Sequence, residues 1–225
     1  NNYNTAVGYA AGAAMTTGVN NTLIGGHAGD AMQDDNQNTA VGARAMSTLQ
    51  ADDCVAVGYA AMDAATTSAR TTAVGRSAMG AGVVTGNDNT AIGNKSQLNV
   101  TSGEFNTSLG SLSMGVGATT GNYNTTVGYQ AGKNQTSGTE NTYVGGFTGA
   151  NTTTGTHNTG VGMQVMQNTT VGVQNTALGT YALFTNVDSS KNVAVGYEAL
   201  KTLEPASAVN SFNTAVGCKA GKAMT

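Results

Sequence analysis

The chain has 225 residues, of which only 9% are charged, and its formal net charge is −3. This balance provides no basic surface for nucleic acid, and no apolar run approaches the roughly 20 residues that a membrane span requires. Aromatic residues make up 5% of the chain, tryptophan is absent and glycine contributes 32 residues. We therefore expect a thin core of small side chains on a regular scaffold, with no nucleic-acid partner and no membrane insertion.

One short motif, first seen as Asn4-Thr5-Ala6-Val7-Gly8, recurs along the whole chain. Successive copies lie 16 to 21 residues apart, most of them 17. A nearly constant period of this length is typical of repeat architectures, in which each repeat packs on its neighbours. The thirteen copies end at Gly8, Gly25, Gly42, Gly58, Gly75, Gly93, Gly110, Gly128, Gly145, Gly162, Gly179, Gly196 and Gly217.

Within each repeat the elements follow a fixed order. A turn residue such as Gly18 or Asp35 lies seven positions before the final glycine, and a strand then follows. Comparison of the copies suggests that the aliphatic residue before the glycine points inward. The threonine two residues earlier would share that face, because side chains alternate along a strand. The small and flexible residues three and four positions after the glycine also look buried, within a second short strand or a single helical turn.

These observations predict an all-β protein, a β-solenoid (parallel β-roll) of about thirteen 17-residue coils. Neighbouring coils would be spaced by about 4.8 Å and joined by backbone hydrogen bonds. We expect one repeat array over residues 1–225, with a loop insertion at 201–212 that contains Pro205. Neither end shows an atypical capping repeat, so we expect a segment of a longer array or a unit that stacks end to end.

An asparagine precedes the threonine in most copies. Stacked at one corner of successive coils, these side-chain amides are expected to hydrogen-bond along the stack as a structural ladder. The members are Asn4, Asn21, Asn38, Asn89, Asn106, Asn124, Asn141, Asn158, Asn175, Asn192 and Asn213, with Cys54 and Thr71 in the two remaining copies.

The blocks Asn124–Gly132 and Asn192–Leu200 carry a pattern of the form NTAVGYxA. This pattern resembles the repeats of YadA-like trimeric autotransporter adhesin heads and the NTAVGY-type arrays of phage tail fibres. The resemblance implies a left-handed parallel β-roll, a homotrimer and an extracellular, cell-surface or virion location. It favours no particular receptor.

Catalytic chemistry finds little support in the sequence. The two histidines, His27 and His157, occupy different positions of the repeat and lie 130 residues apart. Cys54 and Cys218 are also far apart in the sequence and fit best as small side chains that fill repeat positions, so we expect no disulfide. With no grouping of catalytic or metal-ligating residues, we also expect no enzyme activity and no cofactor. Four acids in the turns of neighbouring coils are a weak candidate calcium site, with solvated turn carboxylates as the alternative. They are Asp34, Asp35, Asp52 and Asp53.

The sequence thus predicts a structural or adhesive segment of an extracellular or virion fibre, as a stalk or a head. Self-association, a host-surface glycan and a host protein are the expected partners, with outward tyrosines and phenylalanines as contacts. One alternative is a filament subunit that polymerises through open solenoid ends. Ice binding is a third hypothesis. It is disfavoured here because the regular threonines are expected to share the buried face.

Overall fold

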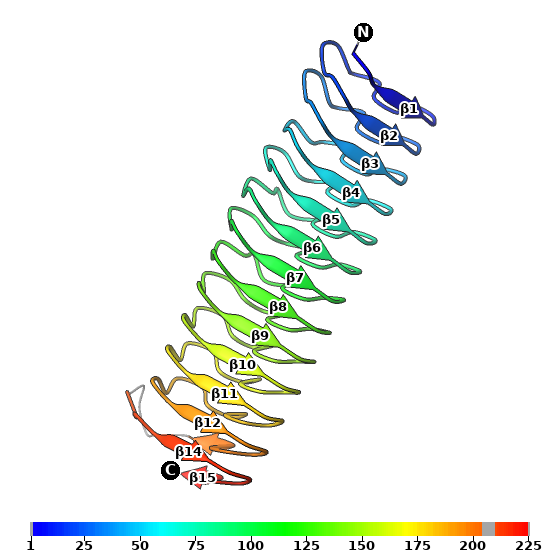
Figure 1. The fold of residues 1–225 in the computed structure, drawn as a ribbon. Coiled ribbons are helices and arrows are strands. Elements are labelled where there is room, and N and C mark those ends of the chain that lie inside the picture. The colour runs from blue at the N-terminus through cyan, green and yellow to red at the C-terminus, as the bar shows by residue number, and fades with distance from the viewer. Residues whose placement is uncertain (1, 204–209, 225) are drawn as a thin grey trace. The chain divides into compact units, whose positions relative to one another are not determined.

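A computed structural model describes residues 2–203 and 210–224, and in this part of the chain it is all-β, without a helix. Each repeat contributes one short strand, and the coils stack as a solenoid, which confirms the predicted fold class (Figure 1). The strands are β1 (Thr5–Val7), β2 (Thr22–Ile24), β3 (Thr39–Val41), β4 (Val55–Val57), β5 (Thr72–Val74), β6 (Thr90–Ile92), β7 (Thr107–Leu109), β8 (Thr125–Val127), β9 (Thr142–Val144), β10 (Thr159–Val161), β11 (Thr176–Leu178), β12 (Val193–Val195), β13 (Thr202–Leu203), β14 (Thr214–Val216) and β15 (Ala223–Met224).

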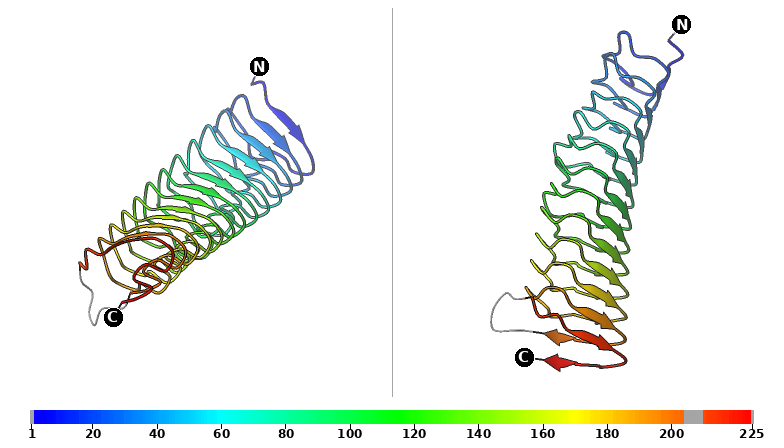
Figure 2. Two further views of the ribbon diagram at one scale, coloured as in Figure 1. Left: turned by 60° about the horizontal axis from the view of Figure 1, so that its bottom comes forward. Right: turned by 60° about the vertical axis from the view of Figure 1, so that its left-hand side comes forward.

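The chain divides into two compact units, Asn1–Leu112 and Ser113–Thr225. In the first unit β1 to β7 pair in sequence order, each parallel to the next and in register by one repeat, as in Thr5↔Thr22. In the second unit β8 to β12 continue to β14 in the same way, and β13 pairs with β15. Within each unit the strands lie along one side of the stack (Figure 2).

Backbone hydrogen bonds join the coils beyond the strands as well. Gly25 N–H donates to Val7 O at 2.8 Å in the strand region, and Gly12 N–H donates to Ala28 O at 2.9 Å in the following turn. The segment after each glycine consists of turns and not of a second strand, except at β13 and β15. Of the predicted insertion, Thr202–Leu203 forms β13 and Asn210 bridges to Ser190, while residues 204–209 lie outside the described residues.

The side-chain direction in the strands corrects the sequence interpretation. From β2 onward the middle residue is buried, and the residues on either side of it are exposed or half-buried. In β3, for example, Ala40 is buried, whereas Thr39 and Val41 reach solvent. The prediction that the threonine and aliphatic positions point inward is therefore wrong. Three residues per strand give alternation but do not say which face is inside, and a constant aliphatic residue fits an exposed column as well as a core.

Volume complementarity explains why the variable middle residue is the buried one. Where it is large, the residue four positions after the glycine is itself glycine: a Cβ on Gly149 would lie 2.6 Å from the ring of Tyr143, and one on Gly29 would lie 2.9 Å from Leu23. Gly12, Gln97 and Gly221 accompany the small residues Ala6, Ala91 and Ala215, but in seven other coils a small middle residue is matched by methionine or leucine four positions after the glycine. These pairs are Ala40/Met46, Ala56/Met62, Ala73/Met79, Ser108/Met114, Gly160/Met166, Ala177/Leu183 and Ala194/Leu200.

The glycine that ends each motif meets two demands at once. Gly25 has φ +136°, and a Cβ built on it would lie 2.5 Å from the backbone of Gly42 in the next coil. Both a side-chain-free residue and an unusual backbone angle are therefore needed at this bend.

Each coil also turns through left-handed backbone at residues that carry side chains. In the part of the chain that the structure describes, thirty-four non-glycine residues have positive φ, from Leu200 at 45° to Lys191 at 63°. They fall five positions before the motif glycine and two or four positions after it. The left-handed region costs an L-residue roughly 1–2 kcal/mol, so the coil-to-coil hydrogen bonds and the packed core must offset many such terms.

Candidate functional site

The outward side of the strands forms a continuous surface in each unit, which we call the strand face. It consists of a threonine column and an aliphatic column, and none of its members is charged or buried. In the first unit the members are Thr5, Thr22, Thr39, Val55, Thr72, Thr90 and Thr107 with Val7, Ile24, Val41, Val57, Val74, Ile92 and Leu109. In the second they are Thr125, Thr142, Thr159, Thr176, Val193 and Thr214 with Val127, Val144, Val161, Leu178, Val195 and Val216.

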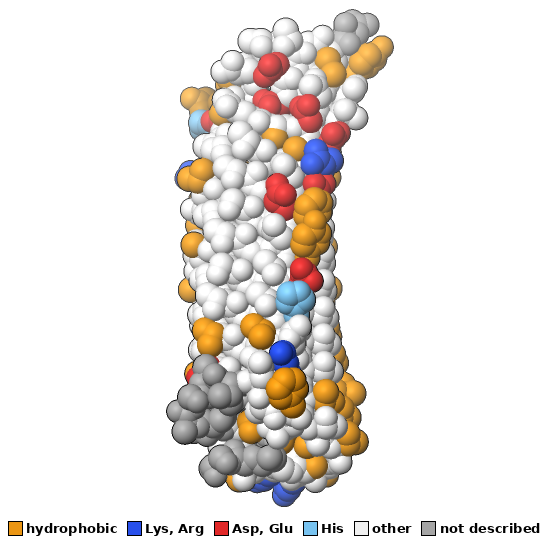
Figure 3. Space-filling model, turned by 90° about the vertical axis from the view of Figure 1, so that its left-hand side faces the viewer, with side chains coloured by type: hydrophobic (Ala, Val, Ile, Leu, Met, Phe, Trp, Pro, Cys, Tyr) orange, Lys and Arg blue, Asp and Glu red, His pale blue; other side chains and the backbone are white. Residues whose placement is uncertain are grey.

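The strand face leaves large apolar side chains in water. Val161 is 37% exposed and Leu178 is 48% exposed. Scattered exposed apolar residues are ordinary, but a contiguous apolar stripe marks an interaction surface in soluble proteins. Figure 3 shows the side that carries the turns before the strands, and most of that surface is neither charged nor hydrophobic.

The asparagines hydrogen-bond along each unit as a directional ladder. Asn141 N–H donates to Asn124 Oδ1 and Asn158 N–H donates to Asn141 Oδ1, both at 3.0 Å, and the pattern continues to Asn213. In most coils the Nδ2 also reaches a turn carbonyl in the following coil, as from Asn158 to Gly172 O at 2.8 Å. Where Cys54 replaces asparagine, its Sγ contacts Ser68 O at 3.0 Å in the same role. Burial raises the pKa of the Cys54 thiol to about 11.

Two further polar rows escaped the sequence analysis. In the first unit Asn36 N–H donates to Asp52 Oδ1 at 2.6 Å, one position before the left-handed turn residue. In the second unit Asn134 Nδ2 donates to Asn151 Oδ1, and Asn151 Nδ2 donates to Asn168 Oδ1, at 2.9 and 2.8 Å. The regular spacing of Asn134, Asn151 and Asn168 is the signal that was available for this second ladder.

The candidate calcium acids have separate structural roles. Asp52 accepts the Asn36 amide hydrogen bonds, and buried Asp35 accepts from Gln33 N–H at 3.0 Å. Burial raises the pKa of the Asp35 carboxyl, whereas Asp34 and Asp53 are exposed. Across residues 2–203 and 210–224, no three His, Cys, Asp or Glu side chains converge in an arrangement that would hold a metal ion.

Each histidine pairs with an acidic side chain of its own unit. His27 pairs with Asp30 in its own coil, at 2.9 Å, and His157 pairs with Glu140 of the preceding coil, at 3.1 Å. Both histidine side chains are about half exposed. Cys54 is buried and Cys218 is exposed, and both are free thiols.

Outward aromatic residues contact one another across adjacent coils of the second unit. Tyr129 meets Phe147 edge to face with ring centroids 5.2 Å apart, and Tyr181 meets Tyr197 in the same way at 6.3 Å. The ammonium of Lys201 lies 4.9 Å from the centre of the Tyr181 ring. The predicted contact residues are thus partly engaged with each other.

Glu198 is the most strongly perturbed carboxylate with a resolved shift. Its side chain is 8% exposed and pairs with Lys201 at 2.7 Å and with Lys222 of the next coil at 2.8 Å. The hydrogen bond from Lys201, followed by that from Lys222, lowers the pKa of Glu198 to about 2. This cluster ties two successive coils together at neutral pH.

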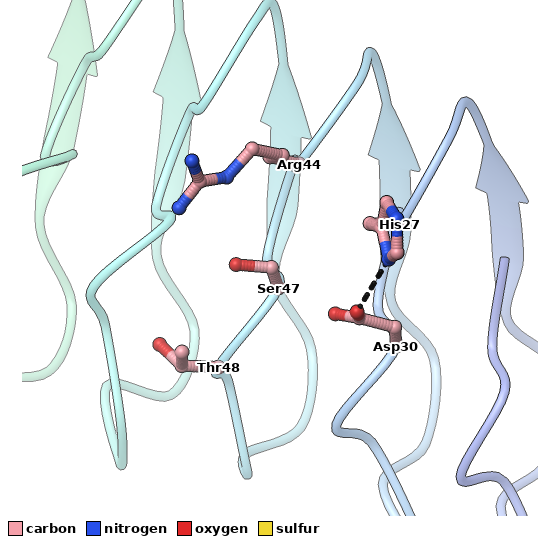
Figure 4. A pocket seen from close by; sticks show the side chains of 5 residues that line it. All are labelled: His27, Asp30, Arg44, Ser47 and Thr48. Carbon is pink, nitrogen blue, oxygen red and sulfur yellow. Dashed lines mark hydrogen bonds and ion pairs between the residues drawn. The ribbon is translucent and has the colours of Figure 1, made fainter. Parts of the chain in front are cut away.

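One polar hollow of about 430 Å³ opens on the first unit (Figure 4). His27 and Asp30 come from the coil of β2, and Arg44, Ser47 and Thr48 come from the coil of β3. Both His27 and Arg44 have left-handed backbone, with φ of 57° and 60°, which directs their side chains outward from the turn. The sequence does not group these five residues into one site, because His27 and Arg44 occupy an outward position of the repeat where the residue varies freely.

Comparison with known proteins adds no relative. No protein-family model, no curated protein and no solved structure matches the chain. Within the described residues, no helix has the length and apolar character to cross a membrane.

Proposed function

We propose that the chain is a structural and adhesive segment of an extracellular or virion fibre, in which three copies associate through their strand faces. The observation that carries the proposal is the uncharged strand face, with an exposed or half-buried aliphatic side chain at the same position of every repeat. Burying these side chains against other copies would remove apolar area from water, at roughly 25 cal/mol per Å². The number three rests on the resemblance to trimeric adhesin heads and tail-fibre arrays.

The fold supports a mechanical role. Each coil is fixed to the next by backbone hydrogen bonds, the asparagine ladder and a thin packed core, so the segment would be stiff and resistant to proteolysis. A repeat surface also displays outward positions at regular intervals, which suits binding to a host-surface glycan or protein. No catalytic step is part of this proposal.

The association is tested by light scattering coupled to size exclusion, with Val161→Lys and Leu178→Lys introduced together. Both side chains are already exposed in the single chain, so the lysines should leave the fold of one chain intact. We expect three chains per particle for the wild type and one for the variant. Gln174→Lys adds a positive charge at an exposed turn and should leave the trimer unchanged. A wild-type monomer, or a trimer that tolerates both lysines, would refute the proposed interface.

Ice binding is the second candidate, because the structure removes the reason for disfavouring it. The threonine column is outward and shares its side of the sheet with the aliphatic column. A regular array of hydroxyl and methyl groups would meet water and not the core. Thermal hysteresis in a monomeric sample, abolished by Thr159→Lys, would favour this alternative over the fibre.

The end-to-end filament remains an alternative proposal. It predicts particles that lengthen with concentration, whereas a fibre segment predicts a fixed number of chains. The same scattering experiment, repeated over a dilution series, separates the two.

A further inference from the structure

The hollow lined by His27, Asp30, Arg44, Ser47 and Thr48 is outside the strand face and has no part in the association proposed above. Figure 4 shows side chains from two adjacent coils around one open space. A site built between coils depends on their register, which the neighbouring β2–β3 pairing fixes.

The acidic side of the hollow has hydrogen-bonding capacity that the protein does not use. Asp30 Oδ2 pairs with His27 Nδ1 at 2.9 Å, whereas Asp30 Oδ1 is shielded from solvent and has no hydrogen-bond partner in the structure. A shielded carboxylate oxygen without a donor is costly, so an incoming hydroxyl donor would be favoured there. The terminal torsion of aspartate is soft, which allows either oxygen to turn toward the hollow.

The opposite side supplies donors and further acceptors. Arg44 is 56% exposed and uses one nitrogen to pair with Asp63 at 2.9 Å, which leaves other guanidinium N–H groups for a ligand. Ser47 Oγ donates to Asp63 Oδ1, and Thr48 Oγ1 donates to Ala65 O at 2.9 Å. Both hydroxyl oxygens therefore retain lone pairs that accept hydrogen bonds.

The balance of charge selects the ligand class. The single guanidinium of Arg44 is paired with Asp63, and Asp30 lines the same hollow, so the hollow has no excess positive charge for an anion. Among the described residues no acidic group is arranged for a metal ion either. A neutral molecule with many hydroxyl groups, each both donor and acceptor, fits this lining. Tyr9 lies beside it, edge to face with His27 at 5.3 Å, and offers an exposed ring to an apolar sugar face.

We propose that this hollow binds the pyranose ring of a saccharide. The inference deepens the proposed adhesive role by naming a ligand class and a place for it. It does not depend on the strand face, so the number of chains and the saccharide are tested separately.

The test is saturation-transfer difference NMR on the full chain, with D-glucose, D-galactose, D-mannose, N-acetyl-D-glucosamine and L-fucose as separate probes. Asp30→Asn keeps the shape of the side chain and removes its charge. Arg44→Met keeps a long side chain in a backbone conformation that methionine adopts elsewhere in the repeat. The matched control is Asp88→Asn, which disrupts an exposed ion pair with Arg70 in the same unit but does not line the hollow.

We expect at least one of the five sugars to receive saturation from the wild type and from Asp88→Asn. Its dissociation constant should rise by about tenfold in Asp30→Asn and in Arg44→Met, as expected for loss of a hydrogen bond to a charged group. Absence of transfer to all five sugars would overturn the proposal, and so would transfer that both hollow variants retain. A trimer that binds no sugar would refute the hollow alone, and a monomer that binds sugar would refute the fibre interface alone.

Discussion

Residues with left-handed backbone provide much of the curvature of each coil. Arginine, histidine, tyrosine and phenylalanine all occupy these positions, although asparagine and glycine are the residues usually found there. The sequence did not reveal them, because no residue type marks the positions. At the two outward positions, five before and two after the glycine, the side chains vary freely, so chemistry such as that of His27 and Arg44 arises without changing the fold.

Tyr143 and Gly149 share one space inside the coil, a bulky residue paired with a glycine. Tyr143→Ala should cost about 3–5 kcal/mol by opening a cavity. Gly149→Met should cost about 3 kcal/mol, because its Cβ would meet the Tyr143 ring at 2.6 Å and because φ is +58°. The double variant recreates the alanine and methionine pair found in the coils of β3, β4 and β5, so its loss should be smaller than the sum by at least about 2 kcal/mol.

Urea denaturation of the three variants measures this coupling. Gly146→Met is the control, because a Cβ at Gly146 would meet nothing within 4 Å. Additive losses in the double variant would show that the two positions do not share one space.

Glu198 should make stability depend on acid pH. Its folded pKa is about 2, against an ordinary value of 4.5, so its contribution is complete above the ordinary value. As pH falls below about 4.5 the unfolded chain takes up the proton first, and the contribution is lost on approach to about pH 2. The melting-temperature gap between wild type and Glu198→Gln should therefore be constant above about pH 5 and close progressively below it. A gap that persists unchanged at low pH would contradict this account.

At the scale of the strand, sequence analysis located the main strand of each repeat but misassigned its faces, and β13 lies within the predicted loop insertion. The Asn-Thr-x-aliphatic-Gly motif marks the first twelve main strands and β14 correctly, because glycine and asparagine have requirements that no other residue meets as well. Which strand residue points inward depends on the volume that it shares with the residue four positions after the glycine, as Leu23 does with Gly29. That covariation was visible within the chain itself and gives the correct face once it is compared across repeats.

The asparagine ladder was predictable, whereas the hollow was not. Asn158 illustrates why. Its backbone and side-chain amides have fixed partners in the coils before and after it, so asparagine recurs at this position of the repeat. The hollow draws on columns where no residue recurs. Asp30 and Arg44 line the same hollow only because of the way the coils stack in three dimensions.

Breaking the ladder at Asn158 tests its contribution. Asn158→Ala removes the acceptor for Asn175 N–H and the donor to Gly172 O, and both groups are buried. We expect a loss of about 2–4 kcal/mol in the free energy of unfolding, measured in urea. Asn94→Ala, at an exposed position, should cost less than about 0.5 kcal/mol. Equal losses of unfolding free energy in Asn158→Ala and Asn94→Ala would show that the ladder does not stabilise the fold.

At the scale of the whole molecule, stability is a sum over coils and their interfaces. Removing Asp53–Ala69 deletes one full coil and joins Asp52 to Arg70 in phase. It also brings the Ala40/Met46 pair next to the equivalent Ala73/Met79 pair. We expect a folded β-protein with a modestly lower melting temperature, followed by circular dichroism. Deleting Asp53–Ala61 removes about half a coil and should abolish cooperative melting, and survival of that variant would contradict the register argument.

The interchangeable hydrogen bonding of successive coils also bears on inheritance. A gene that encodes tandem repeats can gain or lose whole repeats through recombination or slipped replication. In this fold the gain or loss of one coil leaves every remaining coil beside a neighbour with an equivalent strand, asparagine and glycine. The shortened or lengthened protein therefore keeps the same hydrogen-bonding pattern. The length of the solenoid can therefore change by one coil at a time during evolution, with a folded protein at each step.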